Sequence, residues 1–139
     1  MRAINRRTLL VFAGVVSLFS TAAHADERED AIAAAKAVVT ALAEKKFALI
    51  WDTLTSDRYK MGATREMFIL ALTSARREIG RLTSSKLVHV RDNAPQLPDG
   101  YKGKSYAVVF ENVYTTGTRL EGALIIEENG QFKMNGLST

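Results

Sequence analysis

The side chains that most often carry acid–base or nucleophilic chemistry are scarce in this sequence. It contains no cysteine and two histidines, His24 and His89. His24 belongs to an N-terminal segment that we expect to be removed, which leaves His89 as the one candidate general base. The alternative is a half-buried histidine that supports the scaffold. We therefore expect no catalytic constellation, and His89 is the only catalytic candidate.

Metal binding and paired-carboxylate chemistry have equally little support. There is no second histidine near His89, no cysteine and no calcium-loop spacing, so we expect no metal and no cofactor. Glu111 and Glu121 fall on neighbouring predicted strands and could face each other. They lie among valine and alanine on what we predict to be the outer sheet face. There, Arg119 or Lys133 would balance their charge.

An aromatic face offers the best candidate binding surface. Residues 105–115, SYAVVFENVYT, have high β-propensity and place Tyr106, Phe110 and Tyr114 on one side of a strand. Such rings form a closed core by default, but they could also line a partly open pocket. Buried tyrosine hydroxyls need partners, which water or a ligand would supply. The candidate ligand-binding residues are Trp51, Phe68, Tyr106, Phe110 and Tyr114.

Basic residues cluster around the end of the last predicted helix and the first strand. The cluster consists of Arg76, Arg77, Arg81, Lys86 and Arg91. A solvated face is the simplest interpretation, and an acidic partner or an anionic envelope surface is the alternative. Predicted export and a nearly neutral charge of the mature domain argue against nucleic acid.

The first 25 residues have the three parts of a secretory signal peptide. A basic start, an apolar run over residues 9–19 and the small-residue site around Ala23 and Ala25 predict cleavage after Ala25. The apolar run is too short for a stable membrane anchor. Cleavage removes three arginines, so 19 basic against 15 acidic residues become 16 against 15. The predicted product is a single periplasmic or secreted domain, residues 26–139, exported by either the general or the twin-arginine route.

Helical patterns fill the first half of this domain. Residues 26–46 are alanine-rich with acids at the start, and residues 47–54 form a shorter apolar stripe that the stretch 55–63 breaks. Thr64 is a plausible N-cap for a helix that runs to residue 79, with Gly80 as its left-handed end. The predicted buried positions are Ile32, Ala35, Val39, Leu42, Phe47, Ile50, Trp51, Leu54, Phe68, Leu72, Ala75 and Ile79.

After Gly80 the apolar period changes to that of strands. We predict strands over residues 84–92, 105–115, 119–128 and 131–137, with a loop at 93–104 and a tight hairpin at Asn129-Gly130. In the first strand, Leu87 and His89 would share one face. Helices followed by an antiparallel meander predict an α+β domain: three N-terminal helices packed on a curved four-stranded antiparallel sheet.

Several motifs in this order resemble a known family. They are Trp51-x-x-Leu54, Arg77-x-x-Gly80, Leu97-Pro-Asp-Gly, Tyr106-x-Val-x-Phe110 and the stretch ENGQFKMNG at 128–136. Together they resemble the bacterial exported proteins of domain of unknown function 4019, although Phe132 stands where that family usually has tryptophan. The resemblance implies a cystatin-like, nuclear-transport-factor-2-like (NTF2-like) roll and carries no established activity.

We therefore expect a non-catalytic domain that binds a small molecule or a periplasmic protein. One alternative is a hydrolase- or isomerase-like enzyme with His89 in the roll cavity. Another is an inhibitor or homodimeric assembly module whose apolar outer sheet face meets a second copy. The residues predicted to form that face are Val88, Val90, Val109, Val113 and Ile125.

Overall fold

The computed structural model describes residues 6–93 and 101–138, with side chains from residue 25 onward. All of the predicted signal segment except Ala25, and most of the loop at 93–104, lie outside the residues described in full. The helical elements are α1 (Arg6–Ala43), α2 (Phe47–Leu49), the π-helix η1 (Ile50–Leu54), α3 (Asp57–Lys60) and α4 (Arg65–Ala75). The strands are β1 (Leu82–Asp92), β2 (Ser105–Tyr114), β3 (Gly117–Glu128) and β4 (Gln131–Ser138). The predicted α+β class is confirmed.

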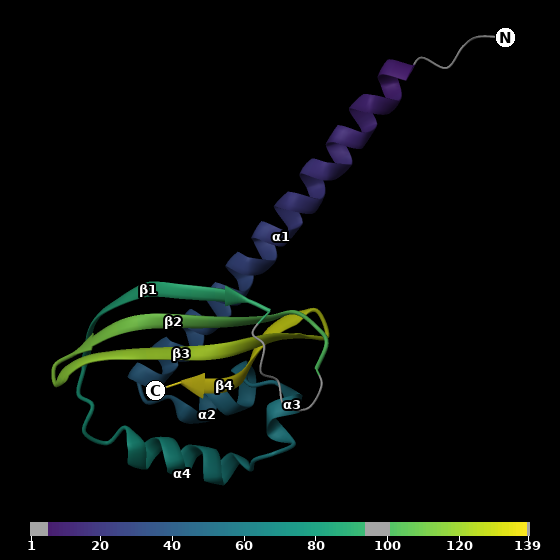
Figure 1. Cartoon of the computed structure of the whole chain (residues 1–139). Coiled ribbons are helices and arrows are strands. Elements are labelled where there is room, and N and C mark those ends of the chain that lie inside the picture. The colour runs from purple at the N-terminus through teal and green to yellow at the C-terminus, as the bar shows by residue number, and fades with distance from the viewer. Residues whose placement is uncertain (1–5, 94–100, 139) are drawn as a thin grey trace.

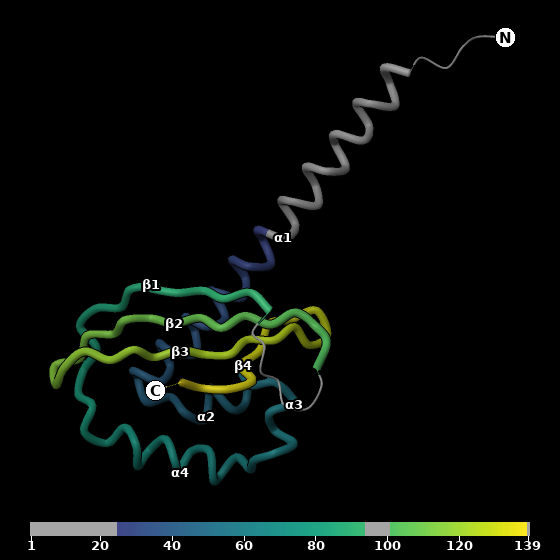
Figure 2. The backbone as a smooth tube through the Cα atoms, viewed as in Figure 1, coloured from purple at the N-terminus to yellow at the C-terminus, as the bar shows by residue number. Residues whose placement is uncertain are grey.

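The strands form one open antiparallel sheet in the order β1-β2-β3-β4. Alternation along β2 turns Tyr106, Val108 and Phe110 toward the helices, where they join the core built on α1 and α2. Figure 1 shows α2 and the end of α1 behind the sheet, and Figure 2 shows α4 below them, on the side of the β4 edge. The predicted hairpin is confirmed, because Asn129 and Gly130 have positive φ angles of 53° and 76°.

Helix α1 presents its alanine-rich, β-branched face to the sheet, as predicted for Ala35, Val39 and Leu42. Its end differs from the prediction, because the helix stops at Ala43 and not at residue 46. The amide of Lys46 donates to the carbonyl of Ala41 (2.8 Å), and the amide of Lys45 donates to that of Leu42 (3.1 Å). This is a Schellman ending with Lys45 at the left-handed position, φ 59°. The acids at 26–30 lie inside α1 and not in its first turn.

The predicted second helix is split between α2 and η1. The hydroxyl of Thr55 donates to the carbonyl of Ile50 (2.7 Å), and Thr55 then forms a parallel bridge with Met134. The Ser56 amide donates to the Met134 carbonyl (2.8 Å), so this segment covers part of the β4 edge. Ser56 also caps α3 by accepting from the Tyr59 amide. The predicted break at 55–63 is therefore wrong over the four residues of α3.

Helix α4 begins as predicted, with the Thr64 hydroxyl accepting from the Met67 amide (3.3 Å). It ends at Ala75, four residues earlier than predicted, and Ala75 is exposed. Gly80 has the expected positive φ, 83°, but it belongs to the connection into β1. A Cβ at Gly80 would overlap the hydroxyl of Thr115 in the β2–β3 turn. Glycine is required here by both the backbone conformation and the lack of space.

Strand β1 contains a bulge that the alternation in the sequence does not show. Leu87 pairs with Phe110 while His89 pairs with Val109, so Val88 is an extra residue. Leu87 therefore faces the helices and His89 faces away from them. The prediction that these two side chains share a face is wrong, because the bulge resets the alternation.

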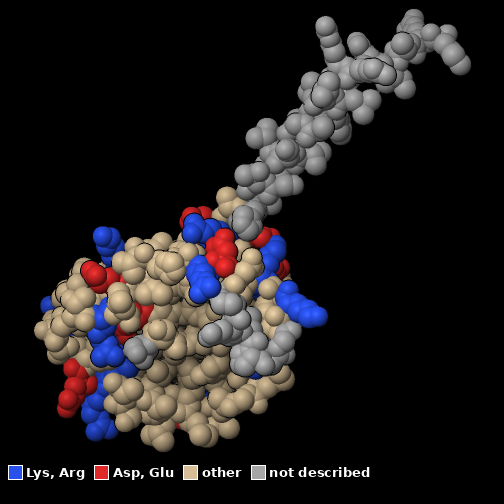
Figure 3. Space-filling view, viewed as in Figure 1, with Lys and Arg blue, Asp and Glu red and all other residues tan. Residues whose placement is uncertain are grey.

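The outer sheet face is less apolar than predicted, because two of its expected members point inward. Val90 pairs with Val108, and Ile125 pairs with Tyr106, so both face the helices. Figure 3 shows an uncharged centre on this side of the molecule, with charged side chains toward its borders. A shallow groove of about 240 Å³ crosses this face, lined among others by Ala107, Val109, Gly122, Leu124 and Gly136.

Candidate functional site

The five aromatic residues predicted to bind a ligand are all buried side chains. Trp51, the most exposed of them, retains 8% of its accessible surface. Its ring centroid lies 5.3 Å from that of Phe68, and Tyr59 packs edge-on against both rings. Tyr106 packs against Phe132 with centroids 5.9 Å apart, also edge-on. All five rings are therefore buried in the interior of this structure.

Tyr114 finds its partners inside the protein and not in a ligand. Its hydroxyl hydrogen bonds with the carboxylate of Glu121, and an Arg76 amino group donates to the same hydroxyl at 2.8 Å. The Asn112 amide donates to the Glu121 carboxylate (3.0 Å) and accepts from the Ser85 hydroxyl (2.6 Å). We call Arg76, Asn112, Tyr114 and Glu121 the carboxylate clamp.

The carboxylate clamp is a buried ion pair with every charged group hydrogen-bonded. Arg76 is 2% exposed and Glu121 is fully buried, and the two form a two-nitrogen contact. Burial alone would raise the pKa of the Glu121 carboxyl, but the bonds from Arg76, Asn112 and Tyr114 lower it overall. Burial also raises the pKa of the Tyr114 phenol, and the neighbouring carboxylate raises it further. Each charge depends on the other to remain buried.

The predicted positions of Glu121 and Arg76 are both wrong. Glu121 was expected beside Glu111 on the outer face, but it pairs with Phe110 and faces the helices, while Glu111 pairs with Leu120. The two-residue turn between Tyr114 and Gly117 sets this register, and a shift of one residue would reverse every side chain. Arg76 was expected on a solvated basic face. It turns inward because α4 ends just before it.

His89, the only catalytic candidate, lies on the outer sheet face. Its side chain is exposed, and its register partner Val109 also faces away from the helices. The aromatic cluster of Trp51 and Phe68 lies on the other side of the sheet.

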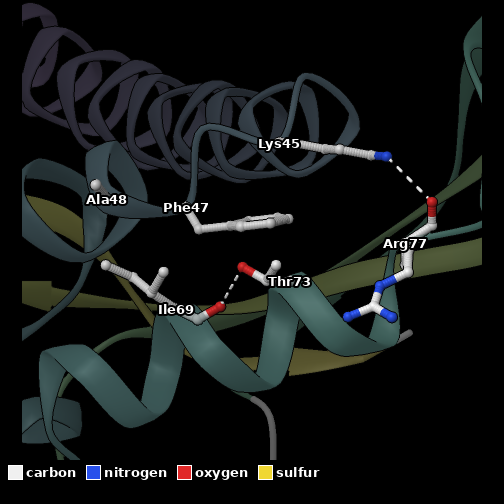
Figure 4. Close-up of a pocket in the computed structure, with 6 residues that line it drawn as sticks. All are labelled: Lys45, Phe47, Ala48, Ile69, Thr73 and Arg77. Carbon is white, nitrogen blue, oxygen red and sulfur yellow. Dashed lines mark hydrogen bonds between the residues drawn. The ribbon is translucent and has the colours of Figure 1, made fainter.

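A cleft of about 410 Å³ lies between α2 and the end of α4. Its lining residues are Lys45, Phe47, Ala48, Ile69, Thr73 and Arg77. Figure 4 shows the Phe47 ring extending over α4, with Ile69 at one end of the cleft and the two cations at the other. Phe47 is buried and Ile69 is half-buried, and together with Ala48 they give the cleft an apolar floor.

The two cations at the end of this cleft are not neutralised. The Lys45 ammonium donates to the Arg77 carbonyl at 3.4 Å, and the Arg77 guanidinium bends back toward Thr73 (Figure 4). Within residues 25–93 and 101–138, neither side chain forms an ion pair with a carboxylate. The Thr73 hydroxyl donates to Ile69 of its own helix (2.7 Å), which leaves its oxygen able to accept a further bond.

No pattern in the sequence indicated this cleft. Lys45 fell inside the helix predicted over residues 26–46, and Arg77 was interpreted as part of a solvated cluster. Their proximity depends on how the end of α1 meets the end of α4, and those segments are 32 residues apart. The only local signal was a lysine pair at a helix end that lacks the usual glycine.

Comparison of the chain with protein-family models, with curated proteins and with solved structures found no match. In the described part of the chain, no helix is both long enough and apolar enough to cross a membrane. The same residues contain no group of three or more histidine, cysteine or acidic side chains suited to a metal ion.

The carboxylate clamp predicts strong coupling between Arg76 and Glu121. Arg76→Met or Glu121→Leu alone leaves one charge buried without its partner, so each should lower the free energy of unfolding by about 3–5 kcal/mol. The double variant leaves neither charge and should lose less than either single variant. Urea denaturation of all four proteins measures this. Effects of the single variants that simply add in the double variant would contradict it.

The lowered pKa of Glu121 also predicts a pH dependence with a definite sign. Because the folded-state pKa lies below the ordinary value of 4.5, the ionised carboxylate stabilises the fold above that pH, and this stabilisation is lost as pH falls through the folded-state pKa. The stability difference between the wild type and Glu121→Gln should therefore shrink below about pH 4.5. Urea denaturation from pH 7 to 3 measures it, with the exposed Glu111→Gln as control. A difference that stays constant over this range would refute the assignment.

Proposed function

We propose that this chain is a non-catalytic binding domain that takes a small ligand in the cleft between α2 and α4. The observation that carries the proposal is the pair of cations, Lys45 and Arg77, at one end of an apolar cleft with no carboxylate partner among the described residues. A volume of about 410 Å³ is in the range of small-molecule sites. Few, convergent polar groups above an apolar floor are typical of such sites.

The lining favours binding over catalysis. Lysine and arginine supply positive charge, and the Thr73 hydroxyl is already a donor to its own helix. The lining holds no acid or histidine to accept a proton from Thr73 or from a bound water. The six side chains can therefore orient and neutralise a ligand, but they do not form a nucleophile–base pair.

We infer that the domain is a cystatin-like, NTF2-like roll of the kind implied by the resemblance to domain of unknown function 4019. The element order supports this inference, because all helices of the described residues precede a four-stranded antiparallel meander. In such a roll the concave sheet face is a common place for a ligand. Here the rings Trp51, Tyr106 and Phe110 fill that face, which favours the neighbouring helix–helix cleft as the site.

We also propose that the domain acts outside the cytoplasm, after removal of residues 1–25. The basic, apolar and small-residue parts of that segment support this proposal. A periplasmic small molecule is the partner class that fits best with the cleft.

Filling the cleft should abolish ligand binding without unfolding the domain. Thr73→Trp places an indole between α2 and α4, whereas Ser74→Trp adds the same group at an exposed position outside the lining. We expect amide NMR shifts from a library of small acids and neutral compounds to map to the cleft, and Thr73→Trp to weaken each such ligand at least tenfold. Ser74→Trp should bind like the wild type. Shifts that map elsewhere, or a Thr73→Trp variant that binds normally, would refute this site.

Export is tested separately from binding. Expressed from its own first residue in a Gram-negative host, the protein should accumulate in the periplasm with Asp26 as its N-terminal residue, as determined by intact-mass spectrometry. A variant with Ala23→Tyr and Ala25→Tyr should remain uncleaved, because the cleavage site requires small side chains. Full-length protein in the cytoplasm would contradict the proposal.

A further inference from the structure

Lys45 occupies a backbone conformation that favours glycine. Three non-glycine residues of the described chain have positive φ angles: Lys45, Asn93 and Asn129. Asparagine tolerates this left-handed conformation better than other non-glycine residues, whereas lysine gains nothing from it. Glycine is also the usual residue at this position of a Schellman ending. The backbone conformation at position 45 therefore favours glycine, and yet a lysine side chain occupies it.

The left-handed conformation places the Lys45 side chain at the cleft. From this turn the ammonium reaches the carbonyl of Arg77 at 3.4 Å and comes to lie beside the end of α4 (Figure 4). A carbonyl oxygen accepts the hydrogen bond but does not neutralise the charge. Lys45 and the guanidinium of Arg77 thus form an uncompensated pair of cations at one end of the cleft. Strain at such a position is a recurrent feature of functional sites.

The rest of the cleft is suited to a hydrocarbon chain. Phe47, Ala48 and Ile69 form the floor, and the Thr73 hydroxyl is bonded to the Ile69 carbonyl. A peptide would bring backbone N–H groups that need acceptors, and the lining side chains are mostly apolar or cationic. An aliphatic chain has no N–H groups and therefore needs no hydrogen-bond acceptors. A carboxylate head group fits the two cations, since arginine and lysine both form charge-assisted bonds with carboxylates.

We propose that the cleft binds a medium-chain aliphatic monocarboxylate, a proposal that rests on the ligand-binding function proposed above. The carboxylate lies between the Lys45 ammonium and the Arg77 guanidinium. The Thr73 oxygen can accept a hydrogen bond only from the protonated carboxylic acid, because the Thr73 hydroxyl already donates to the Ile69 carbonyl. The chain extends over Phe47 toward Ile69. Lys45 is then a specificity-determining residue, and its left-handed conformation is what directs it to the ligand.

The probe is octanoate below its micelle concentration, titrated into the full domain by calorimetry and followed by amide NMR. We expect saturable binding with shifts at the cleft residues, and at least tenfold weaker binding of octanamide, which has the same chain and no charge. Lys45→Gly should bind octanoate at least tenfold more weakly while its melting temperature equals or exceeds that of the wild type. Lys46→Ala, which removes an adjacent charge that pairs with Glu44 outside the cleft, should bind within twofold of the wild type.

The outcomes separate this inference from the proposed function. If octanamide binds in the cleft as tightly as octanoate, or if Lys45→Gly leaves octanoate binding unchanged, the carboxylate assignment is overturned and the binding domain stands. Tighter binding of a tetrapeptide with a C-terminal leucine would likewise overturn it in favour of a peptide. If no compound of either series shifts the lining residues, both the inference and the cleft as a binding site are overturned.

Discussion

The Glu121 carboxylate fixes the position of the end of α4 relative to the sheet. A carboxylate in a fully buried position must be compensated by a cation and by hydrogen-bond donors, and here Arg76, Tyr114 and Asn112 supply them. Tyr114 and Asn112 come from the neighbouring strand, but Arg76 follows α4. The end of α4 is therefore held at one place beside the sheet. If the end of α4 moved and took Arg76 away from the sheet, the buried Glu121 carboxylate would lose its cation.

This constraint also shapes the cleft. Because Arg76 turns inward to the clamp, its neighbour Arg77 projects to the exposed side of the same turn. There it meets Lys45, which the end of α1 directs to the Arg77 carbonyl. Two adjacent arginines thus have different physical roles. One is desolvated and neutralised, and the other stays solvated and uncompensated by any acid of the described residues, which is the condition for recognising an anionic ligand.

Helix α2 supplies the remaining wall. Phe47 begins this short helix directly after the left-handed turn, so its ring covers the apolar side of α4 near Ile69. Three other rings of the core do not take part in the cleft: Trp51, Tyr106 and Phe110 are buried between the sheet and the helices.

Local patterns accounted for most of the fold. The inward alternation of Tyr106 and Phe110, the Thr64 cap and the Asn129-Gly130 hairpin were predicted because each depends on nearby residues. Val90, Ile125 and Glu121 were wrongly predicted on the outer face, and His89 was wrongly predicted to share a face with Leu87. Their orientation depends on a bulge at Val88 and on the register of the Thr115–Thr116 turn. A single inserted residue or a one-residue shift reverses a strand face, and alternation alone does not reveal it.

The sequence by itself determined that helices precede four antiparallel strands and which rings of β2 face inward, because these follow from period, propensity and turn chemistry over a few residues. Only the tertiary structure decided that Arg76 is buried while Arg77 is exposed, and that Lys45 reaches Arg77. Both facts arise from contacts between segments far apart in the chain: Arg76 with Glu121, and the end of α1 with the end of α4. The free energy of burying a charge depends on what the fold places next to it, and residue spacing along the chain does not contain that information.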